Sequence, residues 1–572
     1  PVYLAGCRDS AYRGLKLGRY LRWQAIIALL GIVLLAALLR YAAYNFTTVT
    51  VPDKGGAYVE GVAGSVQYLN PLLSQYNQVD ALLVSLLFNG LTRLDEQGNV
   101  VPDLAEGWTV SPNGLTYDFR LRAGLTWHDG APVTAADGLY TVGALQADDF
   151  PGVPWLRTLW KAVKAEAPDG PDGLAIRFTL EQRLPSFLDY TTIGLLPAHL
   201  WARIPVAELE QSQLNTRPVG TGPWQMAKLT ATRAELTPNP RYAGATPHLA
   251  ELAFRFYPDH QSLLPAYDRK EIDGVSALWP EEIAGAARRP DLQLFSAPLS
   301  GYTVIYLNQG NPNVAFFQDT AVRQALLYAL DRQALIDAVL HGQGIVAHSP
   351  LLPGTWAYDA EVPEVAPVGA QARRLLVEAG WLLPEGEKVR QKDGQKLSFI
   401  LVGDNARLLE AIAQDWAKVG VDAAVQPVTL AGLTTDFLAP RSFDAAVVHW
   451  ELAGDPDPYP LWHSTQIKDG QNYGGWNDRP TDETIEQARA ATELAARRNY
   501  YVQFQRIFAR EAPALLLYYP VFTYGVRDKV HGVQIGPLNE PHDRFRNVAE
   551  WYIVTRRITV GGQNTKFDRP AQ

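Results

Sequence analysis

Cysteine is almost missing from this sequence: among its 572 residues the only one is Cys7. Nothing after that position can form a disulfide, a cysteine-ligated zinc site or a thiol nucleophile. A body without thiols suits an exported domain, although many cytosolic domains also lack cysteine. The scarcity therefore excludes three kinds of chemistry and leaves the compartment to other signals.

Charged residues are also few, at 19% of the chain against a typical share of about 25%, while apolar residues reach 47%. This balance fits neither a disordered acidic chain nor a coiled coil. The length corresponds to about three or four domains on a prior of roughly 100 to 200 residues each. Because aromatic residues make up 10% of the chain and Gly and Pro number 46 and 40, we expect a large globular protein with many turns.

Clusters of basic residues are confined to the N-terminus. Residues 1–24 carry a net charge of +4, whereas the chain after Arg40 has 45 basic and 59 acidic side chains. Binding to nucleic acid phosphates requires clustered Lys and Arg. We therefore predict no nucleic-acid partner.

Catalytic signatures are missing as well: the chain has no GxxxxGK[ST], HExxH or GxSxG motif. Residues 342–344 (GQG) imitate a dinucleotide fingerprint but follow a predicted helix instead of a strand, so we interpret them as a loop. Asp455 and Asp457 offer two carboxylates for a cation, but the prolines between and after them are typical of a stiff turn. The sequence predicts no enzyme, no cofactor and no metal.

One long apolar run is present, residues 25–39 (AIIALLGIVLLAALL), with aromatic residues on both sides. Fifteen residues are short for a membrane-spanning helix of about 20 and suit a signal-peptide core, but interfacial aromatics extend the run. A cleavage site needs small residues, and each nearby register places Tyr41 or Tyr44 at a key position. We interpret residues 25–44 as an uncleaved transmembrane signal anchor; a removed signal peptide is the alternative.

The charge distribution predicts how this anchor is oriented. Basic residues before the run outnumber those after it, which places residues 1–24 in the cytoplasm and the main body outside, as a single-pass protein of the cell membrane. Residues 45–56 are polar and broken by Pro and Gly, so we expect a linker there. The folded body then begins near Ala57.

The body changes character about halfway along. Up to about residue 297, short apolar runs alternate with turn signals, and residues 116–122 (TYDFRLR) alternate as in a strand. Asp319 begins a helical pattern that continues to Gly342. Strand-like residues 397–402, 421–428 and 443–450 then alternate with helical segments. This βαβαβ series predicts an α/β fold with a partly parallel sheet.

Several motifs resemble one family, the extracellular solute-binding proteins of ABC importers, in the dipeptide- and oligopeptide-binding class (family 5). The motifs are residues 86–91 (LLFNGL), 102–108 (PDLAEGW), 117–122 (YDFRLR), 127–130 (WHDG), 134–137 (TAAD), 218–224 (PVGTGPW), 322–326 (VRQAL), 454–457 (GDPD) and 472–476 (NYGGW). The resemblance spans about residues 57 to 550. It implies a two-lobed periplasmic-binding-protein-like fold with an extra subdomain on lobe 1 and closure around a ligand.

The resemblance also implies where the domains lie. Lobe 1 is expected at residues 57–297 and 520–555, with the extra subdomain at about 75–215, and lobe 2 at residues 298–519. The two crossing segments are expected near residues 302–307 and 515–519. Residues 556–572 remain as a C-terminal tail.

Similar proteins bind ligand along the strand that ends at residues 447–452, whose backbone pairs with an extended peptide. In peptide-binding members an Asp three residues after the Trp binds the peptide's amino group, and here that position is Ala453. Recognition of a free amine is therefore in doubt, unless Asp455 or Asp457 substitutes, and a sugar, a modified peptide or another polar solute is open. The candidate ligand-binding residues are Tyr302, Trp356, His449, Trp450, Glu451, Asp455, Asp457 and Trp476.

Two functions remain open from the sequence. The first is a membrane-anchored receptor that delivers a peptide or similar polar solute to an ABC permease. The second keeps the fold but is an accessory, structural or sensory subunit of a larger membrane complex, which the uncleaved anchor would explain. Ligand recovered with the purified protein would support the first, and stable co-purification with other membrane subunits the second.

Overall fold

The computed structural model describes residues 24, 26–41, 48–95, 98–452, 454–491 and 493–559. The chain divides into two compact units, one holding both ends, Pro1–Gly55 and Tyr552–Gln572, and the other Gly56–Trp551. The predicted cytoplasmic segment, residues 1–24, lies almost wholly outside the described residues, as do residues 560–572 of the predicted tail.

The unit that holds the chain ends contains a helix and a two-stranded ribbon. Residues 26–41 are helical, and their large apolar side chains are exposed. No helix among the described residues has the length and hydropathy needed to cross a membrane. Strand β1 (Thr48–Pro52) pairs antiparallel with β22 (Thr555–Thr559), so the predicted linker contains a strand instead of being irregular throughout.

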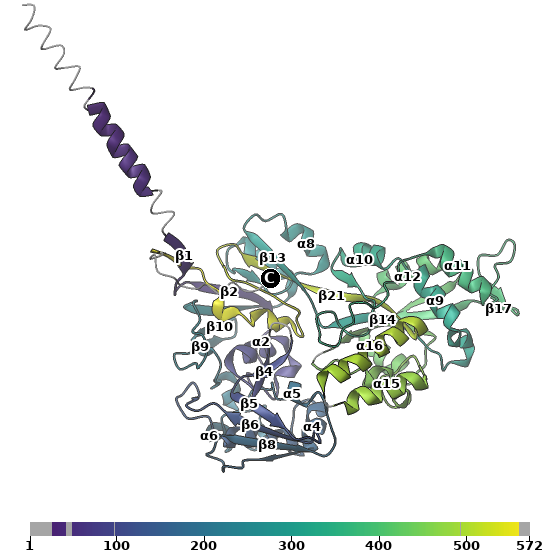
Figure 1. Ribbon diagram of the computed structural model, residues 1–572, viewed down its shortest axis with the longest axis horizontal. Helices are drawn as coiled ribbons and strands as arrows, with labels where there is room; N and C mark the ends of the chain where they lie inside the picture. Colours follow the sequence, from purple (N-terminus) through teal and green to yellow (C-terminus); the bar gives the residue numbers. More distant parts are fainter. Residues whose placement is uncertain are drawn as a thin grey trace, which may run out of the picture. The chain divides into compact units, whose positions relative to one another are not determined.

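The larger unit is built on a sheet of twelve strands (Figure 1). Along the sheet the order is β19 (Asp422–Pro427), β18 (Ser398–Gly403), β20 (Ala445–Glu451), β14 (Gly301–Leu307), β21 (Ala514–Arg527), β12 (Gly274–Val275), β2 (Ala57–Ala63), β11 (Glu251–Tyr257), β10 (Arg233–Pro238) and β9 (Trp224–Thr230), with β13 (Leu292–Pro298) and β15 (Gly344–Val346) also on β21.

Strand β21 joins two lobes. Its N-terminal half pairs with β14 and β15, and its C-terminal half pairs with β13 and β12. We call the part built on β2 and β9–β13 lobe 1 and the part built on β14, β15 and β18–β20 lobe 2. The chain crosses between the lobes at residues 298–301 and 518–521, next to or overlapping the predicted crossing segments. Leu538 forms a β-bridge with Leu299, so a third segment of the chain lies beside the first crossing.

Lobe 1 carries a separate sheet of four antiparallel strands, β5 (Ala105–Val110), β6 (Thr116–Leu121), β8 (Ala175–Leu180) and β7 (Val163–Glu166). The strand predicted at residues 116–122 is confirmed as β6, whose buried residues alternate. Trp160, Phe178 and Phe187 pack edge to face beneath this sheet. A hairpin of β3 (Thr92–Leu94) and β4 (Val100–Pro102) connects it to the rest of lobe 1.

The helices of lobe 1 are short. They are α2 (Gln78–Leu87), α3 (Ala135–Gln146), α4 (Pro154–Lys161), α5 (Phe187–Tyr190), α6 (Ala198–Trp201), α7 (Leu263–Asp268) and α8 (Pro280–Ala286). Helix α2 begins at Asn77, whose side chain accepts a hydrogen bond from the backbone N of Val79. This cap satisfies an amide that the first turn leaves without a partner.

Lobe 2 confirms the predicted alternation of strands and helices. Strands β18 and β19 are parallel and joined by α12 (Ala406–Ala417), which Asn405 caps, and β18 is also parallel to β20. The other helices are α9 (Thr320–Ala329), α10 (Arg332–Leu340), α11 (Gly369–Glu378), α13 (Leu430–Gly432), α14 (Tyr459–Trp462), α15 (Arg479–Ala490) and α16 (Leu494–Glu511), and β16 (Gln391–Lys392) pairs with β17 (Gln395–Lys396).

One predicted element of lobe 2 is wrong. The continuous helix expected from Asp319 to Gly342 is two helices, α9 and α10. Leu330 has an extended backbone, and the Asp331 side chain accepts from the backbone N of Ala334 to begin the second helix. The apolar periodicity continues across the break because both helices bury Leu residues in the same core cluster.

Candidate functional site

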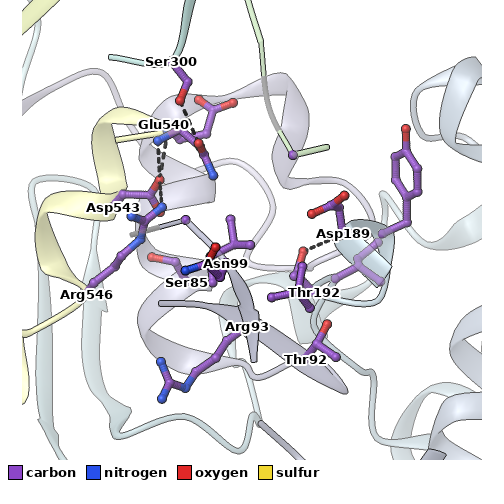
Figure 2. Close-up of a pocket in the computed structure, with 18 of the residues that line it drawn as sticks. Ser85, Thr92, Arg93, Asn99, Asp189, Thr192, Ser300, Glu540, Asp543 and Arg546 are labelled. Carbon is purple, nitrogen blue, oxygen red and sulfur yellow. Dashed lines mark hydrogen bonds and ion pairs between the residues drawn. The ribbon is translucent and has the colours of Figure 1, made fainter. Parts of the chain in front are cut away.

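A cavity of about 1800 Å³ lies between the two lobes. Lobe 1 contributes α2, the β3–β4 hairpin, α5 and the segment 537–550, and lobe 2 contributes the end of β20, the loop that follows it, and residues 350–356. Figure 2 shows part of this wall, with Arg93, Asp189 and Glu540 around it. A pocket this large exceeds the roughly 300 to 1,000 Å³ typical of small-molecule sites.

The glycine-rich motif at residues 218–224 packs against the C-terminal end of α2 at this wall. A Cβ added to Gly220 would lie 1.9 Å from the carbonyl oxygen of Leu87, and one on Gly222 would lie 2.4 Å from that of Leu86. Only glycine allows the backbone to approach the end of the helix this closely. Gly220 in turn donates its backbone N–H to Nδ1 of His128 at 3.1 Å, so two sequence motifs that lie far apart in the chain are packed together.

Charged and polar side chains form a cluster on the lobe 1 side of the cavity. The carboxylate of Asp103 accepts a hydrogen bond from Asn89 at 2.8 Å, and Nε of Arg122 donates to the Asp103 backbone carbonyl at 2.8 Å. Burial raises the pKa of Asp103 to about 6, against the opposing effect of Asn89, Arg93 and Arg122. Arg93 itself is exposed and lines the cavity (Figure 2), so its guanidinium is available to an anionic group.

The lobe 2 wall is aromatic where β20 ends. Trp450 donates from Nε1 to the hydroxyl of Tyr306 at 2.9 Å and is parallel to Tyr473, with the ring centroids 5.9 Å apart. Trp356 also lines the cavity and lies against Tyr501. These contacts hold the indole rings in place, so each ring presents a fixed apolar surface to the cavity.

One edge of β20 has a free stretch. Pairing with β18 ends at Val402 and Ala446, whereas pairing with β14 continues to Glu451. Among the described residues, the β18-facing edge of residues 447–451 thus has no strand partner. Such an edge exposes backbone N–H and C=O groups that can pair with an extended chain.

The two aspartates after β20 are both paired with arginines. Asp455 accepts two hydrogen bonds from the guanidinium of Arg497, and both side chains are 8% exposed. Asp457 lies 3.1 Å from Arg489. Because an arginine already neutralises each carboxylate, neither is a free anion for a ligand amine.

Three other carboxylates meet near the crossing between the lobes. Burial, together with repulsion from Glu451 and Asp543, raises the pKa of Glu540 to about 7. Asp543 pairs with Arg546 and accepts from the backbone N of Glu540 at 3.0 Å, as Figure 2 shows. Glu451 is exposed at the end of β20. This part of the cavity therefore carries more negative than positive charge.

The structure places the predicted site residues in two groups. Trp356, Trp450, Glu451, Asp455 and Asp457 line the cavity. Tyr302 and Trp476 are buried in the lobe 2 core cluster instead, and His449 is exposed outside the lining, with Nδ1 within 3.2 Å of the Thr303 hydroxyl. Ala453 lies outside the described residues.

Sequence reasoning missed many charged residues of the wall, among them Arg93, Asp189 and Glu540. Arg93 lies two residues after the family motif at residues 86–91, and that proximity was a usable signal. Asp189 and Glu540 stand in segments without any motif. Among the described residues no cluster of three His, Cys, Asp or Glu side chains suited to a metal ion is present.

Comparison with known proteins identifies the class of protein to which this geometry belongs. Residues 99–472 match the model of the bacterial extracellular solute-binding proteins, family 5 (middle region), and the chain belongs to this family. The two-lobed, mixed α/β fold expected from the resemblance is thereby confirmed.

Individual relatives cover nearly the whole chain. The oligopeptide-binding protein AppA of Bacillus subtilis (strain 168) is 28% identical over 517 residues, 88% of this chain and 92% of the relative. The dipeptide-binding protein of Escherichia coli (strain K12) is 28% identical over 527 residues, 85% and 93% of the two chains.

Solved structures of similar proteins have the same overall fold as this chain. AppA from Bacillus subtilis in complex with a nonapeptide superposes with a TM-score of 0.64 at 27% identity, covering 88% of this chain and 100% of that one. NikZ from Campylobacter jejuni in complex with Ni(L-His) gives a TM-score of 0.66 at 25% identity, with coverages of 87% and 99%. The family fold thus accommodates both a long peptide and a small metal complex.

Proposed function

We propose that this protein is an extracytoplasmic receptor that binds an extended peptide in the cavity between its lobes and delivers it to an ABC permease. The observation that carries the proposal is the β18-facing edge of β20, which has no strand partner in the described part of the chain and ends at the cavity. The size of the cavity supports a peptide of several residues over a dipeptide. The names of the relatives, which are peptide-binding proteins, support the same class of ligand.

The ligand's amino group has no dedicated anion at the position where similar proteins have one. Ala453 occupies it, and Asp455 and Asp457 are already paired with Arg497 and Arg489. Burying an ammonium without a carboxylate partner costs several kcal/mol of lost solvation. We infer that a peptide with a blocked amino terminus, or an uncharged polar solute, binds better than a free short peptide.

We also propose the lobe boundaries expected from the sequence, 57–297 with 520–555 and 298–519. The change of partner along β21 near Pro520 supports them, because the segments on either side belong to different halves of the sheet.

Membrane attachment through residues 25–44 is a further part of the proposal. It is supported by the apolar run and by the exposed apolar side chains of residues 26–41. N-terminal sequencing of the mature protein should then begin before Trp23. A start between Ala42 and Thr50 would instead identify the run as a removed signal peptide.

The decisive test of function is identification of the ligand. Protein purified without denaturation is analysed by native mass spectrometry, and the bound mass is fragmented to identify it. We expect peptides of several residues. Recovery of stoichiometric non-permease membrane subunits, with no small ligand, would favour the accessory-subunit alternative and contradict the receptor function.

A further inference from the structure

The two lobes touch directly at one part of the cavity wall, where α5 of lobe 1 meets the loop after β20 of lobe 2. A carboxylate oxygen of Asp189 accepts a hydrogen bond from the backbone N of Asp455 at 3.0 Å. A Cβ added to Gly454, whose φ is +78°, would lie 3.0 Å from Cγ of Asp189. The glycine backbone thus lets the loop approach the carboxylate closely.

A second contact comes from the same segment of lobe 1. Arg183, which precedes α5, donates from Nη1 to the backbone carbonyl of Ala490 at 2.8 Å, and Ala490 is the last residue of α15. In Figure 1 α5 lies apart from β21, the strand that joins the lobes. A contact far from the crossing segments resists opening of the lobes more effectively than a contact close to those segments, because opening separates distant parts of the lobes the most.

The surroundings of Asp189 are crowded with charge. The charged and titratable groups are Asp455, Asp457, Arg489 and Arg497 from lobe 2, and Arg183, Tyr117 and Tyr190 from lobe 1. Both arginines of lobe 2 are paired with other carboxylates: Arg497 bonds to Asp455 and to the hydroxyl of Tyr501, and Arg489 lies 3.1 Å from Asp457. Among the described residues, Asp189 makes no ion pair with an arginine, and an ionised Asp189 meets repulsion from the Asp455 carboxylate that Arg497 only partly offsets.

We propose that Asp189 and the backbone of residues 454–455 form a proton-controlled latch that holds the two lobes together over the cavity. When Asp189 is protonated, its carbonyl oxygen still accepts the bond from Asp455, while the repulsion from the Asp455 carboxylate disappears. When it is ionised, contact between the lobes costs desolvation of the charge and repulsion. The latch is a property of the lobes themselves and does not depend on the identity of the ligand.

The direction of the pH dependence follows from the contact. Burial, and next the repulsion from Asp455, raise the pKa of Asp189 to about 7 when the lobes touch. Separation of the lobes returns the carboxyl to solvent and to its ordinary acidity. The closed state therefore binds the proton more tightly than the open state. Closure is fully favoured at pH values below the ordinary pKa of an aspartate, and this advantage is lost as the pH rises through about 7.

Closure can be measured without ligand by electron spin resonance distance measurements on the full chain. Cys7 is the only native cysteine, so a Cys7→Ser background accepts one label on each lobe at exposed Lys228→Cys and Lys388→Cys. Because the pKa of Asp189 is about 7 in the closed state, the ratio of closed to open molecules should rise about tenfold when the pH is lowered from 8 to 6. Asp189→Asn keeps a neutral acceptor of the same shape and should stay closed at both pH values.

Two further variants separate the latch from a general loss of structure. Arg183→Ala removes the pH-independent contact and should lower the closed-to-open ratio by the same factor at both pH values. Gly454→Ala should lower the closed-to-open ratio at both pH values, because the new Cβ would lie 3.0 Å from Cγ of Asp189. An identical ratio at pH 6 and pH 8 in the parent protein, or full retention of the pH dependence in Asp189→Asn, would overturn the proposal.

Discussion

At the scale of single residues, the most buried ion pair among the described residues of lobe 1 is that of Glu60 with Arg544. Glu60 is fully buried and accepts hydrogen bonds from the hydroxyl of Tyr58 at 2.8 Å and from Nε of Arg544 at 3.1 Å. Arg544 belongs to the segment Pro541–Phe545, and its neighbours His542 and Asp543 line the cavity. This ion pair therefore attaches part of the site to the central sheet.

Removing one partner of this pair leaves the other charge buried and unpaired. We expect Glu60→Gln to lower the free energy of unfolding by about 3 to 5 kcal/mol, measured by urea denaturation. The matched control is Glu106→Gln, which breaks an exposed pair with Arg120 at 3.3 Å and should cost less than about 1 kcal/mol. Equal effects of the two variants would show that the buried pair does not stabilise the fold.

Specificity for the ligand's amino group also depends on single residues. Ala453→Asp should shift preference towards free amino termini by about 1 to 3 kcal/mol, because a charge-assisted hydrogen bond then becomes available. Calorimetry with a matched pair of free and N-acetylated peptides measures the shift, and Ala453→Asn is the uncharged control. Tight binding of the free peptide by the unmodified protein would contradict the argument.

At the scale of elements, β20 has two edges with different roles. The backbone N of Leu452 donates to the carbonyl of Ser300 at 3.0 Å, so by the alternation of antiparallel pairs Val448 bonds to β14 and His449 directs its backbone groups to the other edge. Proline has no N–H to donate, and it is tolerated mainly where that N–H is not used by the sheet.

A pair of proline substitutions tests this difference. His449→Pro should leave the protein folded and weaken binding of the recovered peptide about tenfold or more, since one ligand-facing N–H is lost. Val448→Pro removes a bond within the sheet and should lower the melting temperature strongly. Circular dichroism and calorimetry give both readings. Unchanged affinity in a folded His449→Pro variant would contradict strand addition at β20.

At the scale of the whole molecule, a ligand that contacts both lobes should favour the closed state. Saturation with the recovered ligand at about 100 times its Kd should stabilise the protein by about 2.7 kcal/mol through mass action. The radius of gyration from small-angle scattering should fall at the same time. The control is an equal concentration of the free amino acids. Thermal stabilisation with unchanged scattering would show that binding does not close the lobes.

Much of this protein was predictable from local sequence. The alternating residues of β6, the α/β series of lobe 2 and the helix start at Asp319 follow from backbone hydrogen bonding and side-chain burial, which repeat along the chain. The family motifs predicted the class of fold because they are found at similar spacing in related proteins. The strand, helix and cap patterns depend on neighbouring residues, so the sequence by itself determined them.

The tertiary structure alone decided the chemistry of the cavity. Asp455 is paired with Arg497, and Tyr302 and Trp476 are buried in the lobe 2 core and do not line the cavity. Asp189 meets the loop after β20 although 266 positions separate it from Asp455. Sequence periodicity does not predict such long-range partners, because the way the lobes pack decides which charged side chains come together. The same packing excludes solvent from a carboxyl and thereby sets its pKa.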